Sequence, residues 1–223
     1  MPILTVDCFG RSITLDNPSS QARQRWLGEM SPEPETKQWI SELPPGAVFW
    51  DIGANIGIWS VHAAVRGLRV VAIEPHPSYI QELEQTIRRN QLDLLTIQAA
   101  LLDSRGAGAL VRGRSKHTFK TCDPAFGIPA ASLTMDMLAR EIGLWPDYIK
   151  LDVDGNEHQI IAGGTEVLQR VKSMLVEIDP VVSPKLAALI EKRGFRYDRD
   201  QVAACMIREG KYAGTANYIF NRG

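Results

Sequence analysis

Two acidic segments of the sequence carry residue types that suit ligand binding and catalysis. The first is VFWDIGANIGIWS, residues 48–60, in which an aspartate stands directly before a glycine-rich turn. The second is IKLDVDGNEH, residues 149–158, in which acids follow an apolar run. Both runs are typical of buried strands, and ligands of open α/β sheets bind outside the carboxyl ends of the strands. The two segments are therefore expected at one crevice.

The first segment predicts a ligand that contains a ribose and a positive charge. Gly53 permits a tight turn and Gly57 permits close packing of the following helix. Glu74 ends the next strand, about 20 residues on, where an acid binds ribose hydroxyls. Asp51 would repel a pyrophosphate, and the loop departs from the GxGxxG spacing of NAD sites. These features favour S-adenosylmethionine over NAD. The plainer alternative is that Asp51 caps a helix and Glu74 is a surface acid.

The second segment contains the candidate catalytic residues. Methyl transfer to a hydroxyl requires alignment of the reactants and removal of a proton. Asp152 is the leading candidate for the base or for orientation of the acceptor, and His158 is a further possible base. Lys150 would stabilise a developing alkoxide or pair with Asp152. The structural alternative is a helix start, with Asn156 as the cap and Glu157 complementing the helix dipole.

A divalent metal is possible at the second segment but is not favoured. Asp152, Asp154 and Asn156 offer the oxygen ligands that Mg²⁺ and Ca²⁺ prefer. A full set of about six oxygen ligands is not visible there, so we predict no metal site.

Composition narrows the class of protein. The chain has 223 residues, 44% of them hydrophobic, and a net charge of -1, which suits one large domain without a basic bias. Nucleic-acid binding is not indicated, because it needs clustered Lys and Arg. Cys8, Cys122 and Cys205 are too dispersed for a zinc site or a disulfide framework. No signal peptide or membrane-spanning run is seen, so a cytoplasmic location is expected.

Strand and helix patterns alternate along most of the chain, which predicts a mostly parallel sheet covered by helices. Strands are expected at 48–52, 69–73, 94–99, 148–153 and 174–178, and helices at 58–65, 77–90, 134–142, 157–168 and 184–192. The tail, at 195–199, 202–208 and 215–221, alternates like strands and predicts an antiparallel addition at one edge.

We expect two parts: a lead-in segment, residues 1–44, and a ligand-binding domain, residues 45–223. The lead-in segment should form a hairpin from 2–6 and 12–15 and two helices within 20–42 that are separated by Ser31-Pro32-Glu33-Pro34. The insertion at 103–130 should form a hairpin plus a loop, with a basic run at Arg112, Arg114, Lys116 and Lys120.

The sequence resembles the FkbM-type methyltransferases from about residue 45 to the end. The resemblance lies in FWDIGANIGIWS (49–60), AIEPHPSYIQELEQTIRRN (72–90), YIKLDVDGNEHQIIAGG (148–164), MLVEI (174–178) and NYIFNR (217–222). It implies a Rossmann-like methyltransferase fold and O-methylation of hydroxyls on polyketides, sugars or glycolipids. One departure is Asp154, where the family more often has glutamate, which keeps the charge but shortens the reach.

Carried over by position, the resemblance implies a set of cofactor-binding residues. These are Asp51, Gly53, Ala54, Asn55 and Gly57 in the loop, Glu74 at the ribose, and Ala100, Leu101 and Asp103 beside the adenine. The expected partner is a small-molecule or carbohydrate acceptor, selected by residues 1–45 and the insertion. Two alternatives stay open: an NAD-dependent oxidoreductase, and a methyltransferase-like binding module without turnover.

Overall fold

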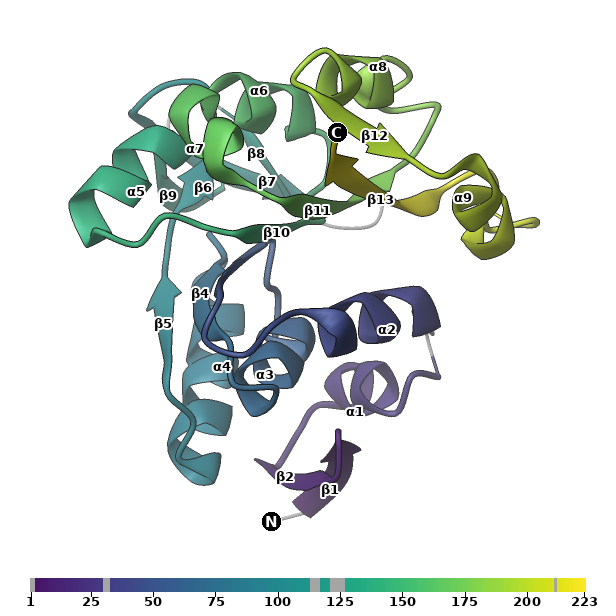
Figure 1. Cartoon of the computed structure of the whole chain (residues 1–223). Helices are drawn as coiled ribbons and strands as arrows, with labels where there is room; N and C mark the ends of the chain where they lie inside the picture. Colours follow the sequence, from purple (N-terminus) through teal and green to yellow (C-terminus); the bar gives the residue numbers. More distant parts are fainter. Residues whose placement is uncertain (1–2, 30–32, 113–116, 121–126, 211) are drawn as a thin grey trace.

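A seven-stranded sheet forms the centre of the protein in a computed structural model that describes residues 3–29, 33–112, 117–120, 127–210 and 212–223 (Figure 1). From edge to edge its strands are β12 (Phe195–Tyr197), β13 (Ala216–Arg222), β11 (Ser173–Ile178), β10 (Tyr148–Leu151), β3 (Val48–Ile52), β4 (Arg69–Ile73) and β5 (Leu94–Ile97). Strand β13 runs antiparallel to both of its neighbours, and the other pairs are parallel. The predicted mostly parallel sheet with an antiparallel C-terminal addition is confirmed.

The strand order reverses between β3 and β10. The chain passes from β3 to β4 and β5 on one side, and β10 and β11 lie on the other side. Such a reversal opens the crevice in which open α/β sheets bind ligands. Because Asp51 of β3 pairs in register with Lys150 of β10, the sheet brings the two acidic segments together at this point.

Helices cover both faces of the sheet, which explains why β3 is buried along its whole length. Its residues alternate between two cores: Val48, Trp50 and Ile52 face one, and Phe49 faces the other. The first core includes α5 (Met135–Ile142), α6 (Glu157–Ala162), α7 (Thr165–Arg170) and α8 (Leu186–Glu191). The opposite face packs against α2 (Pro34–Glu42), α3 (Ile58–Val65) and α4 (Pro77–Asn90). None of the described helices is long and apolar enough to cross a membrane.

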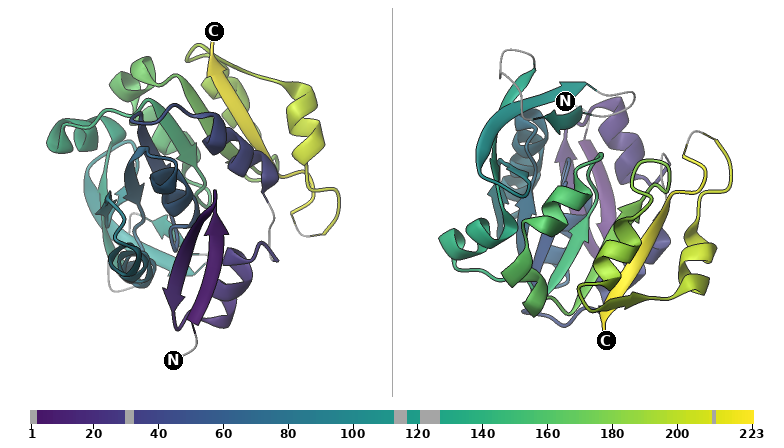
Figure 2. Two further views of the ribbon diagram at one scale, coloured as in Figure 1. Left: turned by 60° about the horizontal axis from the view of Figure 1, so that its bottom comes forward. Right: turned by 90° about the horizontal axis from the view of Figure 1, so that it is seen from above.

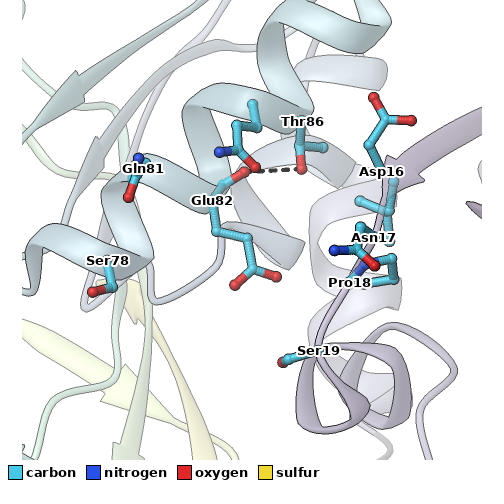
Figure 3. Close-up of a pocket in the computed structure, with 10 residues that line it drawn as sticks. Asp16, Asn17, Pro18, Ser19, Ser78, Gln81, Glu82 and Thr86 are labelled. Atoms are coloured by element: carbon cyan, nitrogen blue, oxygen red, sulfur yellow. Dashed lines mark hydrogen bonds between the residues drawn. The ribbon is translucent and has the colours of Figure 1, made fainter. Parts of the chain in front are cut away.

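The lead-in segment folds against α4 and α3. It forms the expected hairpin of β1 (Ile3–Cys8) and β2 (Arg11–Asp16), followed by α1 (Ser20–Trp26) and then α2 (Figure 2). Asn90, the last residue of α4, accepts a hydrogen bond from Thr14 N at 2.8 Å and donates one to Thr14 O at 2.8 Å. A small cavity of about 250 Å³ lies between the β2–α1 connection and α4 (Figure 3). The two hydrogen bonds between Asn90 and Thr14 fix the hairpin to α4.

The insertion contains more sheet than the sequence predicted. Its described residues and the chain on either side of it form a four-stranded sheet in the order β6 (Ala100–Leu101), β9 (Ile128–Leu133), β7 (Gly106–Arg112) and β8 (His117–Lys120). Strand β9 was not expected, because its small residues and Pro129 give little hydrophobic alternation. Close approach of the backbones requires small residues here: a Cβ on Gly108 would lie 2.2 Å from Lys120 O. Cys122 and the basic residues Arg114 and Lys116 lie outside the described residues.

Two further expectations were wrong. The helix expected at 157–168 is divided into α6 and α7 at Gly163 and Gly164, where a Cβ would lie 2.1 Å from Leu102 O and 2.0 Å from Met135 Cε. The strand expected at 202–208 does not form: residues 202–205 belong to helix α9 (Arg199–Cys205), and residues 206–208 lie in neither a helix nor a strand. Asp198 caps α9 by accepting a hydrogen bond from Asp200 N at 2.8 Å, and this capping outweighs the alternating pattern.

Replacing Gly53 by alanine should destabilise the protein more than replacing Gly46. Both glycines have φ +84, so each alanine pays the left-handed penalty, about 1–2 kcal/mol. Gly46 has nothing within 4 Å of its Cβ position, whereas at Gly53 a Cβ would lie 2.0 Å from Asp152 O. We expect Gly53→Ala to lose roughly 1–3 kcal/mol more in urea unfolding. Equal losses would contradict the close approach.

Candidate active site

The glycine-rich turn after β3 is held by its own backbone contacts. Its five amides all donate inside the protein: Gly53 N and Ala54 N to Ile73 O, Asn55 N to Glu74 Oε2, Ile56 N to Asn55 Oδ1, and Gly57 N to Ala54 O, at 2.8–3.1 Å. A pyrophosphate site would need some of these N–H groups to face the ligand. The turn from Gly53 to Gly57 therefore offers no amide for a phosphate.

Asp51 is a buried carboxylate with one unsatisfied oxygen. It is 1% exposed, and its Oδ2 accepts a hydrogen bond from Ser60 Oγ at 2.6 Å. Its Oδ1 has no hydrogen-bond partner among the described residues. Burial raises the pKa of Asp51, while nearby Lys150 opposes the rise. Asp51 also lines a cavity of about 1100 Å³, so a cationic group bound there would compensate its poorly solvated charge.

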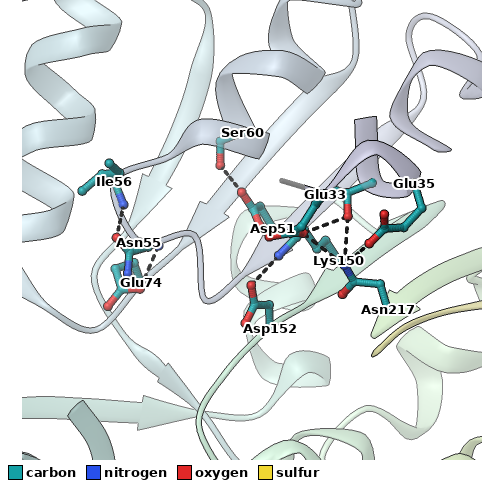
Figure 4. A network of polar contacts seen from close by, with 11 residues as sticks. Glu33, Glu35, Asp51, Asn55, Ile56, Ser60, Glu74, Lys150, Asp152 and Asn217 are labelled. Carbon is teal, nitrogen blue, oxygen red and sulfur yellow. Dashed lines mark hydrogen bonds and ion pairs between the residues drawn. The ribbon is translucent and has the colours of Figure 1, made fainter. Parts of the chain in front are cut away.

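Lys150 is the cation at the centre of a network of carboxylates (Figure 4). It is 1% exposed, and its Nζ lies 2.8 Å from Asp152 Oδ2. Burial acts to lower the pKa of Lys150, but Asp152, Glu33 and Asp51 together raise it above its usual value. The side chain is therefore an ammonium group that cannot act as a base, and the predicted pairing of Lys150 with Asp152 is present.

Glu74 is a buried carboxylate that hydrogen-bonds to the backbone of the glycine-rich turn. It is 7% exposed, and it accepts hydrogen bonds from Asn55 N at 2.9 Å and from His76 N at 2.8 Å. Burial raises the pKa of Glu74 to about 7, although these two bonds lower it. Glu74 is not among the described residues that line the large cavity. Its role at a ribose stays a prediction.

Other predicted site residues lie away from the cavity. Ala100 and Leu101 are buried in β6, and Asp103 is exposed beyond it. His158, half-buried on α6, does not line the cavity, whereas its neighbour Glu157 does. The assignments of the adenine neighbours and of His158 as a base stay predictions.

Asn156 does not cap helix α6 as the structural alternative expected. Asn156 precedes α6 but makes no side-chain capping bond. Its Nδ2 instead donates to Phe119 O of β8 at 3.1 Å, which ties the insertion to the crevice. Glu157 accepts hydrogen bonds from Gly155 N at 3.0 Å and from Ser183 Oγ at 2.9 Å. Within the described ranges, no three His, Cys, Asp or Glu side chains are grouped so that they could hold a metal.

Sequence reasoning missed the residues that the lead-in segment and β13 bring to the site. The lead-in residues that line the cavity are Thr5, Val6, Asp7, Arg25, Trp26, Leu27, Gly28, Glu33, Pro34 and Lys37. Asn217 of β13 donates to Glu33 and Glu35 (Figure 4). A polar residue inside the apolar strand at 216–222 was the available signal for Asn217, because a buried amide needs partners.

Comparison with known proteins identifies the family of the chain. Residues 51–197 match the family model described as the methyltransferase FkbM domain. The chain belongs to the FkbM methyltransferase family. The family expected from the sequence is therefore confirmed.

Two curated relatives are 28% and 30% identical to this chain over about two thirds of its length. The hexuronic acid methyltransferase AglP of Haloferax volcanii is 28% identical over 66% of this chain, and the match covers 62% of that protein. The 31-O-demethyl-FK506 methyltransferase FkbM of Streptomyces tacrolimicus is 30% identical over 67% of this chain and is covered over 54% of its length. The chain thus spans under two thirds of the relatives it matches.

A solved structure confirms the fold. The magnesium protoporphyrin IX methyltransferase of Synechocystis PCC 6803, determined with bound SAM, superposes with a TM-score of 0.57 at 12% identity, over 93% of this chain and 86% of that one. The Rossmann-like methyltransferase fold expected from the sequence is therefore confirmed.

The pKa of Glu74 should appear in the pH dependence of stability. The folded protein holds the Glu74 proton up to about pH 7, whereas the unfolded chain releases it near pH 4.5. Stability should therefore fall as pH rises through this window, by roughly 3 kcal/mol for this group. Urea unfolding of wild type and Glu74→Gln at several pH values would measure it, with exposed Glu141→Gln as the control. A pH-independent difference between wild type and Glu74→Gln would contradict the assignment.

Proposed function

We propose that the protein transfers a methyl group from S-adenosylmethionine to a hydroxyl oxygen of a small molecule or carbohydrate. One observation carries the proposal: the N–H groups of the turn from Gly53 to Gly57 all donate inside the protein, and the buried carboxylate of Asp51 lies beside that turn. Such a site disfavours a pyrophosphate and favours a cation. S-adenosylmethionine has an amine, a sulfonium and a ribose, and it has no phosphate.

The residues present fit this methyl donor. The unsatisfied Oδ1 of Asp51 suits the amino group of its methionine part. Glu74, at the end of β4, would bind the ribose hydroxyls, as an acid in this position does in related sheets. S-adenosylmethionine supplies an electrophilic methyl group when bound, so the protein has to align an acceptor and remove a proton. Asp152, with one oxygen held by Lys150, is suited to orient the acceptor hydroxyl.

The walls of the cavity suit a polar ring as acceptor. Trp26, Trp59 and Tyr212 present aromatic surface, and Arg25 and Lys37 bring positive charge from the lead-in segment. Ligand pockets combine apolar and aromatic walls with a few polar groups that fix orientation, and such a lining suits a ring that carries hydroxyls. The names of the two relatives point in the same direction, since one acts on a hexuronic acid and the other on 31-O-demethyl-FK506.

Titration calorimetry tests the choice of cofactor. We expect S-adenosylhomocysteine to bind at about micromolar Kd and NAD not to bind, because the turn offers no amide to a pyrophosphate. Binding of NAD alone would overturn the proposal and favour an oxidoreductase. Release of S-adenosylhomocysteine on incubation with S-adenosylmethionine and a panel of hydroxylated acceptors, with and without Mg²⁺, then tests turnover. Cofactor binding without turnover on any acceptor would favour a silent binding module.

Asp152→Asn should separate binding from catalysis. The variant keeps the size of the side chain but removes the charge that faces Lys150 and the acceptor. We expect turnover to fall by about tenfold or more while the affinity for S-adenosylhomocysteine changes by less than about threefold. Exposed Asp93→Asn is the control for loss of one acid. Unchanged turnover in Asp152→Asn would remove Asp152 from the mechanism.

A further inference from the structure

We propose that Glu33, supplied by the lead-in segment, is the base that takes the proton from the acceptor hydroxyl. The proposal rests on the proposed function and adds a catalytic residue to it. Glu33 stands outside residues 51–197, the part of the chain that matches the family model. It was not among the catalytic candidates that the sequence suggested.

The fold places Glu33 at the crevice. Glu33 immediately precedes α2, whose first residue is Pro34. It lines the same cavity as Asp51, Asp152 and Lys150, and its charge acts directly on Lys150 (Figure 4). The lead-in segment thus brings a carboxylate to the carboxyl ends of β3 and β10, where the acceptor has to meet the methyl donor.

The hydrogen bonds of Glu33 fix one oxygen and leave the other available. Oε2 accepts from Thr36 Oγ1 at 2.9 Å and from Asn217 Nδ2 at 3.2 Å. Oε1 makes no hydrogen bond to the described part of the chain. This arrangement suits a general base, because two donors hold the carboxylate in place while the second oxygen can accept a hydrogen bond from a hydroxyl.

The other groups at the crevice are less suited to take a proton. Lys150 is protonated, as its surrounding carboxylates require. The Oδ2 of Asp152 is held at 2.8 Å by the Lys150 ammonium, which suits orientation of the acceptor. Asp51 is occupied on both oxygens, since Ser60 Oγ donates to its Oδ2 and the proposed function assigns its Oδ1 to the amino group of the methyl donor.

The surroundings of Glu33 also strengthen it as a base. Burial raises the pKa of Glu33, the charge of Lys150 opposes the rise, and Asp152 and Glu35 add to it. A carboxylate whose pKa lies nearer to neutrality is the stronger general base, and a positioned base accelerates a reaction by roughly 10²–10⁴-fold.

The proposed step is balanced. The acceptor oxygen forms a bond to the methyl carbon, and the carbon–sulfur bond of the donor breaks with its electron pair remaining on sulfur. The hydroxyl O–H bond breaks and its proton passes to Glu33 Oε1. The products are the methyl ether, S-adenosylhomocysteine and a protonated Glu33, which then returns its proton to solvent.

The test compares Glu33→Gln with Glu35→Gln. Both glutamates accept a hydrogen bond from Asn217, but only Glu33 lines the cavity. With the best acceptor of the panel, we expect turnover of Glu33→Gln to fall by roughly 100-fold or more, with S-adenosylhomocysteine affinity within about threefold of wild type. We expect kcat/KM of wild type to rise with pH as the base loses its proton, and this rise should disappear in Glu33→Gln and persist in Glu35→Gln. Wild-type turnover in Glu33→Gln, or equal losses in both variants, would overturn the proposal.

Sinefungin provides a readout that does not depend on turnover. This analogue of the methyl donor carries an amine in place of the reactive methylsulfonium, so its charge should lie near the base. We expect Glu33→Gln to lose about fivefold or more of the preference for sinefungin over S-adenosylhomocysteine, and Glu35→Gln to keep it. If wild type binds both ligands and turns over no acceptor, the methyl-transfer proposal fails, while this ratio still tests the place of Glu33. An unchanged ratio in Glu33→Gln, or loss of both affinities together with folding, would refute the assignment.

Discussion

A single buried ammonium group holds the site together. Lys150 is 1% exposed in the middle of the sheet, and an ion in that position is stable only if opposite charges surround it. Its partners are Asp51 from β3, Asp152 after β10, and Glu33 from the lead-in segment. Three parts of the chain thus converge on one charge. The carboxylates outnumber the cation, so the centre is left with the negative charge that a cationic methyl donor would balance.

In the turn after β3 the backbone amides are used inside the protein, so carboxylates are the groups left to bind a ligand. In phosphate-binding sites the glycine-rich turn leaves its N–H groups facing the ligand. Here Ile73 O, Glu74 and Asn55 occupy those groups, so the turn is rigid before any ligand arrives. What remains at the crevice is acidic. We therefore expect the same strand–turn–helix unit to suit a cation instead of a pyrophosphate, because the N–H groups of the turn are already used inside the protein.

Much of the fold could be predicted from the sequence, because buried parallel strands and amphipathic helices leave strong local patterns. The elements from Val48 to Asn90 were placed within a residue or two. The failures have local physical causes. Gly163 and Gly164 divide a helix because neighbouring backbone and Met135 leave no room for a Cβ, and Asp198 caps a helix where the tail alternates like a strand. Strand β9 was missed because close-packed strands of small residues show little alternation.

The site residues that could not be predicted are those whose partners lie far away in the sequence. The contact between Lys150 and Asp152 follows from their spacing of two residues at the end of β10, and the proximity of Asp51 follows from strand order. Glu33 and Asn217 carried no such signal. Their contact depends on β13 lying next to β11 and on α2 crossing the same face, neither of which is a local property.

The site is built from segments far apart in the sequence, and donor-side and acceptor-side groups come from different segments. The residues that suit the methyl donor lie in the region that matches the family model, on β3, on β4 and in the turn between them. On the acceptor side, Asp152 lies within this region, whereas Glu33 comes from the lead-in segment and is held by Asn217 from β13. If the centre of the sheet binds the methyl donor, the segments outside residues 51–197 can supply different bases and cavity walls. In this chain the base from the lead-in segment interacts with the centre through one buried cation, Lys150. Variation in the acceptor should then be found in the flanking segments, while the Asp51–Lys150–Asp152 centre stays constant.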